Sequence, residues 1–294
     1  MIDIINSELS ELMFVLFPFS CMQAAFMQRA MLALLLIAPL SAISGIQVVN
    51  ARMAFFSDAI GHSAFAGAAI GLLCALPIEF SMPVTAVVVG LLVMLLKRGS
   101  RLSSDTIIGV VFSAVAAFGL AIVARDRSMS SNVRMFLFGD ILTIDGLQIL
   151  ILGVLLVLFI VFQCIAFNRL LLIGINPMLA AVHRIRVEFY RYFFAALLAL
   201  VVIYSVRTAG VVLVTALLVV PAAAARNFAR NTRQMFWFSL LAGYLSCITG
   251  LIASAQPEIN IPAGAAIVLC SVILFAVSEI VSLFRPKRAE DSGV

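Results

Sequence analysis

The amino-acid sequence predicts an all-α protein, a polytopic membrane bundle of about eight or nine transmembrane helices. Of its 294 residues, 64% are hydrophobic and only 11% are charged, and the mean hydropathy is +1.19. Soluble domains have roughly 45–50% apolar and 25% charged residues. Apolar runs long enough to cross a bilayer alternate with short polar breaks. We therefore expect a single transmembrane domain over residues 1–294, surrounded mostly by lipid.

The polar breaks separate successive apolar runs, each bounded by charged residues, Pro or Gly. The run over 209–224 is short, so it is the one that could fail to cross, which leaves eight full spans as an alternative to nine. The segments expected to form helices are 29–49, 54–76, 81–97, 105–124, 146–168, 190–206, 209–224, 236–255 and 262–284.

Positive charge orients these spans. Basic residues concentrate in every second break, which holds fourteen of the 19 Lys and Arg, and the positive-inside rule makes that side cytoplasmic. The N-terminus then faces outward and the tail over 285–294 is cytoplasmic. Residues 1–20 begin with acidic residues and no Lys or Arg, unlike a secretory signal, and predict an amphipathic surface segment. The fourteen are Arg52, Lys97, Arg98, Arg101, Arg169, Arg184, Arg186, Arg191, Arg226, Arg230, Arg233, Arg285, Lys287 and Arg288.

Two ionisable residues interrupt the second apolar run. Asp58 and His62 are four residues apart and should share one helix face. A carboxylate at bilayer depth costs about 2.5 to 3.5 kcal/mol, so it should face a bundle interior or a wet path. One alternative is a purely structural polar pair in which the imidazole satisfies the acid. The other is a functional site, since an Asp oxygen and a His nitrogen suit zinc, manganese or iron(II).

One chain supplies only half of such a site. If two copies pack around a two-fold axis lined by this helix, the symmetric set becomes two Asp and two His. Two carboxylates would neutralise a divalent ion, and four ligands could bind it weakly enough to release it.

A second feature lies on the predicted cytoplasmic side. We expect an apolar helix to end at Pro221, followed by a short surface helix within 221–234. This segment is either a basic turn facing lipid headgroups or a docking helix for a cytosolic partner. The candidate docking residues are Pro221, Arg226, Asn227, Arg230 and Arg233.

Catalytic motifs do not occur in the sequence. It contains no G-x-x-x-x-G-K-[ST] phosphate loop, no H-E-x-x-H and no G-x-S-x-G. The chain is therefore expected to be no enzyme, and ATP hydrolysis, if it drives transport, must occur on another chain. Asp140, before the fifth predicted span, could line an outer entrance, although a turn or cap is an equal alternative. His183 lies among arginines and is expected to be a loop residue.

Five segments follow one another in the chain as FFSDAIGHSAFAGAAIG, SSDTIIGVVFSAVAAFGLAI, FLFGDILTI, AGVVLVTALLVVPAAAARNFARNTRQM and INIPAGAAIVL. In this order they resemble elements of the manganese, zinc and iron chelate ABC permease family. The resemblance covers residues 15–284, and Ser57 and Gly61 depart from it by exchanging small residues around the acid.

The resemblance implies a permease of the bacterial inner membrane that works as a homodimer. It would be coupled to a cytosolic ABC ATPase and fed by an extracytoplasmic metal-binding protein, with no resident cofactor and no nucleic-acid partner. The transported ion would be manganese, zinc or iron. By position, Asp58 and His62 fall on the family's intramembrane Asp and His, and Pro221 to Arg233 on its ATPase-contacting segment.

Two other classes remain open at this point. An ion-coupled secondary metal carrier could use the same Asp58 and His62 as a proton and metal relay. A non-transporting scaffold would need neither side chain.

Overall fold

A computed structural model describes residues 24–100, 102–124, 141, 144–256, 258 and 261–284. In these ranges the chain forms α-helices and no strand, so the all-α prediction is confirmed. The helices are α2 (Ala25–Asn50), α3 (Phe56–Leu73), α4 (Ile78–Gly99), α5 (Ser104–Val123), α7 (Gly146–Ile175), α8 (Pro177–Val182), α9 (Val187–Ala209), α10 (Val211–Phe228), α11 (Thr232–Ser254) and α12 (Ala263–Leu283).

Each of the nine predicted segments corresponds to one long helix. Eight of the described helices are long and apolar enough to cross a membrane, namely α2, α4, α5, α7, α9, α10, α11 and α12. The segment expected to be too short, 209–224, is α10, which extends to Phe228 and is one of the eight. The predicted second span, 54–76, is α3 and is not among these eight, so within the described residues the choice between eight and nine spans stays a prediction.

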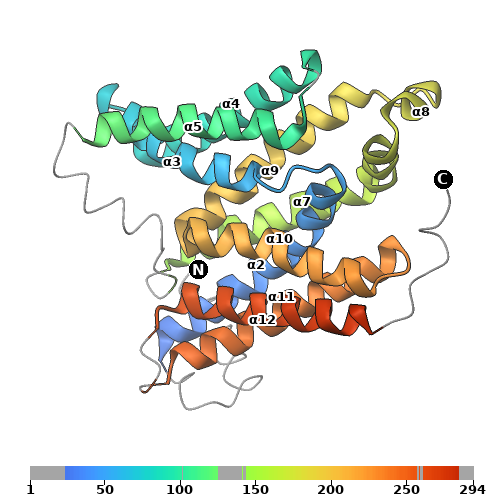
Figure 1. The fold of residues 1–294 in the computed structure, drawn as a ribbon. Coiled ribbons are helices and arrows are strands. Elements are labelled where there is room, and N and C mark those ends of the chain that lie inside the picture. The colour runs from blue at the N-terminus through green and yellow to red at the C-terminus, as the bar shows by residue number, and fades with distance from the viewer. Residues whose placement is uncertain are drawn as a thin grey trace.

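The long helices form two groups that meet along a seam. In one group α3 packs against α4 and α5, and in the other α10 packs against α2, α11 and α12. Figure 1 shows the first group at the top of the view and α11 and α12 at the bottom, with α9 between them. Helices α3 and α10 also contact each other, so the seam runs between them.

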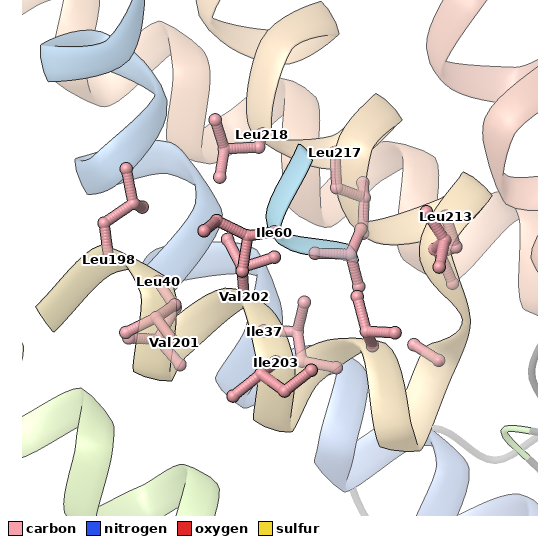
Figure 2. Close-up of a cluster of buried hydrophobic side chains, with 14 of the residues drawn as sticks. Ile37, Leu40, Ile60, Leu198, Val201, Val202, Ile203, Leu213, Leu217 and Leu218 are labelled. Atoms are coloured by element: carbon pink, nitrogen blue, oxygen red, sulfur yellow. The ribbon is translucent and has the colours of Figure 1, made fainter. Parts of the chain in front are cut away.

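An apolar core closes the seam from within. Ile60 of α3 is fully buried and lies among leucine, isoleucine and valine side chains of α2, α9 and α10 (Figure 2). Inside a bilayer such a side chain stabilises the bundle through close packing with its neighbours, because lipid tails are themselves apolar. Ile60 therefore fixes the rotation of α3 about its axis, and with it the direction of Asp58 and His62.

The breaks between helices gather at two opposite ends of the bundle, as the charge pattern predicts. At one end, Arg207 in the last turn of α9 lies 3.8 Å from Glu79 in the first turn of α4. At the other end, Ala51, Lys97 and Arg191 line one small cavity. The assignment of this basic end to the cytoplasm remains a prediction from the positive-inside rule.

The expected helix end at Pro221 is wrong. Helix α10 continues through Pro221 to Phe228, and the proline is buried. Prolines are tolerated inside membrane helices because neighbouring helices satisfy the freed backbone. The actual break is 229–231, where Ala229 is extended and the Asn231 side chain accepts a hydrogen bond from the Gln234 N–H at 2.8 Å. Asn231 thus starts α11, and no separate surface helix occupies 221–234 in the structure.

Three predicted features fall outside the described residues. These are the amphipathic segment over 1–20, the tail over 285–294 and the candidate entrance residue Asp140.

Candidate functional site

Asp58 and His62 occupy the least buried stripe of α3. From Phe56 to Gly71 every residue is buried except these two and Ile70. The predicted shared face is therefore confirmed, and both side chains are half-buried. The rest of the helix is enclosed by its neighbours, so the ionisable pair lies where α3 is least covered by its own chain.

Asp58 lies beside α10, across the seam. Thr215 of α10 lies near the Asp58 carboxylate, although its hydroxyl donates to the Val212 carbonyl of its own helix at 3.3 Å, and His62 attracts the same carboxylate electrostatically. Among the described residues, no ion pair within 4 Å joins Asp58 and His62 directly. Across the seam, α10 therefore places a hydroxyl residue beside the carboxylate, and the alternative of a structural Asp–His pair stays open.

His62 lies between two aromatic rings. Its ring meets Phe112 of α5 edge-on at a centroid distance of 4.9 Å and Phe65, one turn further along α3, at 5.8 Å. These rings restrict the rotation of the imidazole without occupying its nitrogens. A histidine held in this way keeps both nitrogens available for a ligand or a proton.

Small residues let α3 and α10 approach closely at this point. A Cβ on Gly61 would lie 2.8 Å from a methyl carbon of Val211, the first residue of α10. Helix α10 begins there because Gly210 adopts a φ of 85°, a conformation that glycine adopts at little cost. Ser57, the other small residue that departs from the family pattern, is fully buried, and its hydroxyl has no hydrogen-bond partner in the described structure.

Within the described part of the chain, no cluster of three or more His, Cys, Asp or Glu side chains could hold a metal. One chain therefore brings Asp58 and His62 together with Thr215 as a supporting group. Thr215 was missed by sequence reasoning because it lies on another helix. The only available signal was a hydroxyl residue inside the apolar run VVLVTALLVV.

The structure separates the predicted docking residues into two kinds. Pro221 is buried, and the Asn227 side chain donates hydrogen bonds to Ser278 at 3.1 Å and to Glu279 at 2.6 Å. Both are therefore occupied within the bundle. The three arginines of the set, Arg226, Arg230 and Arg233, are exposed at the same end.

The short helix that connects two long helices at the basic end is α8, and it does not lie within 221–234 as expected. The Asn176 side chain accepts hydrogen bonds from the N–H groups of Met178 and Leu179, and Pro177 occupies the first helical turn. Met178 and Val182 are largely exposed. His183 caps its C-terminus, which agrees with the expected loop position.

Together, the membrane-spanning bundle and a polar pair at the seam between its two helix groups define a membrane permease. The chain belongs to the ABC 3 transport family, which residues 23–282 match. This membership agrees with the resemblance seen in the sequence and decides against the ion-coupled secondary carrier. The chain is accordingly a membrane subunit and not an enzyme.

The relatives are similar in length to this chain. The chain is 29% identical to the "High-affinity zinc uptake system membrane protein ZnuB" of Haemophilus influenzae, covering 88% of this chain and 97% of that protein. It is also 29% identical to the "Manganese transport system membrane protein MntC" of Listeria innocua, covering 93% and 96%. Among solved structures, "PsaBC from Streptococcus pneumoniae in complex with Fab" has a TM-score of 0.73 at 26% identity, covering 88% of this chain and 91% of that one.

Proposed function

We propose that this chain is the permease of an ABC importer for a divalent transition metal, with manganese or zinc as the preferred cargo. We also propose that Asp58 and His62 form half of its transient metal site. The observation that carries the proposal is the half-buried Asp58 carboxylate, with His62 one turn away and Thr215 near it across the seam. The names of the relatives, which specify zinc or manganese, support the choice of cargo.

The donor set suits the cargo. A carboxylate oxygen and a neutral imidazole bind zinc, manganese and iron(II), and neither is the soft ligand that copper(I) prefers. Thr215 would act as an outer-shell group that orients the carboxylate, as the partners of metal ligands commonly do. The metal is cargo, so binding must be weak enough for release.

A second copy of the chain would complete the site. Two-fold packing that brings the exposed stripe of α3 toward a second copy supplies two Asp and two His, whose paired carboxylates neutralise a divalent ion. Metal delivered by an extracytoplasmic binding protein would enter between the protomers from the outer side. Closure of the cytosolic ATPase would then re-orient the helices that line the protomer interface and open the inner side. Asp140 remains a proposed lining residue of the outer entrance.

Reconstitution with the partner ATPase and binding protein tests this function. We expect manganese or zinc, loaded on the binding protein, to stimulate ATP hydrolysis by wild-type complexes in liposomes. The same complexes with Asp58→Asn should show only basal hydrolysis, because the ion has no counter-charge in the membrane. Equal stimulation of both complexes would contradict the assigned site, whereas no stimulation by any divalent ion would contradict the function.

Docking of the ATPase is proposed at the basic end, through Arg226, Arg230 and Arg233. Reversing two charges, Arg226→Glu with Arg230→Glu, is expected to reduce co-purification of the ATPase by about tenfold if both arginines pair with acidic residues there. Membrane insertion should stay intact because both side chains are exposed. Affinity purification of the permease with quantification of the ATPase measures this.

A variant of the exposed face of α8 is the matched control for the arginine variant. Met178→Asp with Val182→Asp places two charges on the other short surface at this end. If only this second pair releases the ATPase, docking occurs on α8, and the assignment to the three arginines is wrong.

A further inference from the structure

A basic cavity lies at the end of the bundle away from Glu79 and Arg207, apart from Asp58 and His62. It has a volume of about 430 Å³ and lies between the end of α7 and the start of α9. Its walls combine three guanidinium groups, an imidazole and two aromatic rings, from Arg169, His183, Arg184, Arg186, Phe189 and Tyr190. In the described residues no carboxylate forms an ion pair with these arginines. The cavity therefore has uncompensated positive charge.

Two of the basic side chains are already held in place. The Arg169 guanidinium lies over the Tyr190 ring at 5.2 Å from its centroid, a cation–π contact that restrains a long side chain. The His183 Nδ1 donates to the Leu179 carbonyl at 2.9 Å, which leaves Nε2 as its free ring nitrogen. Restraint before binding lowers the entropic cost of fixing a ligand.

Arg184 occupies a backbone position that favours glycine. Its φ is 57°, and its N–H donates to the Ala181 carbonyl at 2.9 Å while the Ile185 N–H donates to the Ala180 carbonyl at 3.1 Å. This is the left-handed closing turn of a helix, where a side chain costs roughly 1 kcal/mol relative to glycine. This turn places the Arg184 side chain at the cavity wall, and replacing Arg184 with glycine removes the charge without straining the backbone.

An apolar strip leads from the cavity into the membrane-spanning part of the bundle. Phe189 is 58% exposed and stacks on Phe193, one turn further along α9, at a centroid distance of 5.9 Å. Phe193 in turn contacts Phe162 of α7 at 4.8 Å, two turns before Arg169 on that helix. The charges thus lie at the end of the bundle, and the aromatic rings extend inward from them.

We infer that this cavity binds an anionic phospholipid. The phosphodiester lies among Arg169, Arg184 and Arg186, because guanidinium groups recognise phosphate oxygens in bidentate geometry. The acyl chains lie along Phe189 and Phe193. Basic pockets between membrane helices on the cytoplasmic side bind such headgroups. Free phosphate shares the headgroup chemistry but would not use the aromatic strip.

Two glycine variants of the full-length protein test the inference. Arg184→Gly removes one cavity charge and relieves the strained backbone. Arg52→Gly is the matched control, because Arg52 has a φ of 53° in the equivalent closing turn of α2 but does not line the cavity. The probes are phosphatidylglycerol, phosphatidylcholine with the same chains, and inorganic phosphate, and native mass spectrometry of the purified protein measures binding.

We expect phosphatidylglycerol to bind wild type and Arg52→Gly equally, and Arg184→Gly about tenfold more weakly. Phosphatidylcholine should bind all three weakly, and inorganic phosphate should not displace phosphatidylglycerol. Both glycine variants should melt no lower than wild type. The inference is overturned by equal binding to both glycine variants, by equal binding of the two lipids, or by displacement with inorganic phosphate. Loss of the ATPase from Arg184→Gly with unchanged lipid binding would likewise overturn it and identify a protein contact.

Discussion

Asp58→Asn is expected to reduce metal uptake by at least about a hundredfold at unchanged protein levels. Changes to outer-shell partners of metal ligands already cost about 10–100-fold in affinity, and Asp58 is proposed to be a direct ligand. Asparagine keeps the shape of the side chain, and the contact of Gly61 with Val211 is untouched, so the seam between α3 and α10 should hold. What it removes is the negative charge that would offset a divalent ion. Uptake of radioactive manganese and zinc by cells or vesicles measures the effect.

Graded variants distinguish ligands from supporting groups. His62→Ala should lose uptake as strongly as Asp58→Asn, whereas Thr215→Val, which removes only the orienting hydroxyl, should lose about tenfold. Ser63→Ala is the control, since the Ser63 hydroxyl is buried and donates only to the Ile60 carbonyl of its own helix at 2.6 Å. Normal uptake by Asp58→Asn and His62→Ala would exclude the site and favour a structural pair.

The candidate site shows which features local sequence can predict. The spacing of Asp58 and His62 determines their common face because helix geometry is local. Thr215 could not be assigned, because its contact with Asp58 depends on how α10 packs across the seam. The Asn-Pro pair at 176–177 is a helix-start signal that could have identified α8.

Helix ends were mispredicted where a polar residue or proline has a tertiary partner. Arg169 was expected to end the fifth span, yet α7 continues to Ile175, and the guanidinium lies over the Tyr190 ring of α9. Pro221 was expected to end a helix, yet it lies buried inside α10 against its neighbours. Charge and proline mark helix ends reliably only when no neighbouring helix accommodates them, and that neighbour is not visible in a single sequence.

A second close approach, between α2 and α10, holds the group that contains α10 together. Gly45 of α2 is buried, and a Cβ added there would overlap the backbone carbonyl oxygen of Leu218 and lie 3.2 Å from the Cβ of Ala222. Small residues of this kind let membrane helices pack backbone to backbone. A carbonyl inside a helix cannot rotate away as a side chain can, so α10 would have to move as a unit.

Gly45→Ala is therefore expected to destabilise the protein by about 3 kcal/mol, the upper end of the range for overpacking. Thermal unfolding of the purified protein in detergent measures the effect. Gly109→Ala is the matched control, because a Cβ at Gly109 of α5 would meet no atom within 4 Å. There, alanine should raise stability by about 0.5 to 1 kcal/mol through its better helix propensity.

Since Thr215 lies on α10, displacement of that helix by Gly45→Ala should also weaken metal uptake in whatever protein still folds. Equal melting temperatures for the two variants would show that α2 and α10 do not meet at Gly45.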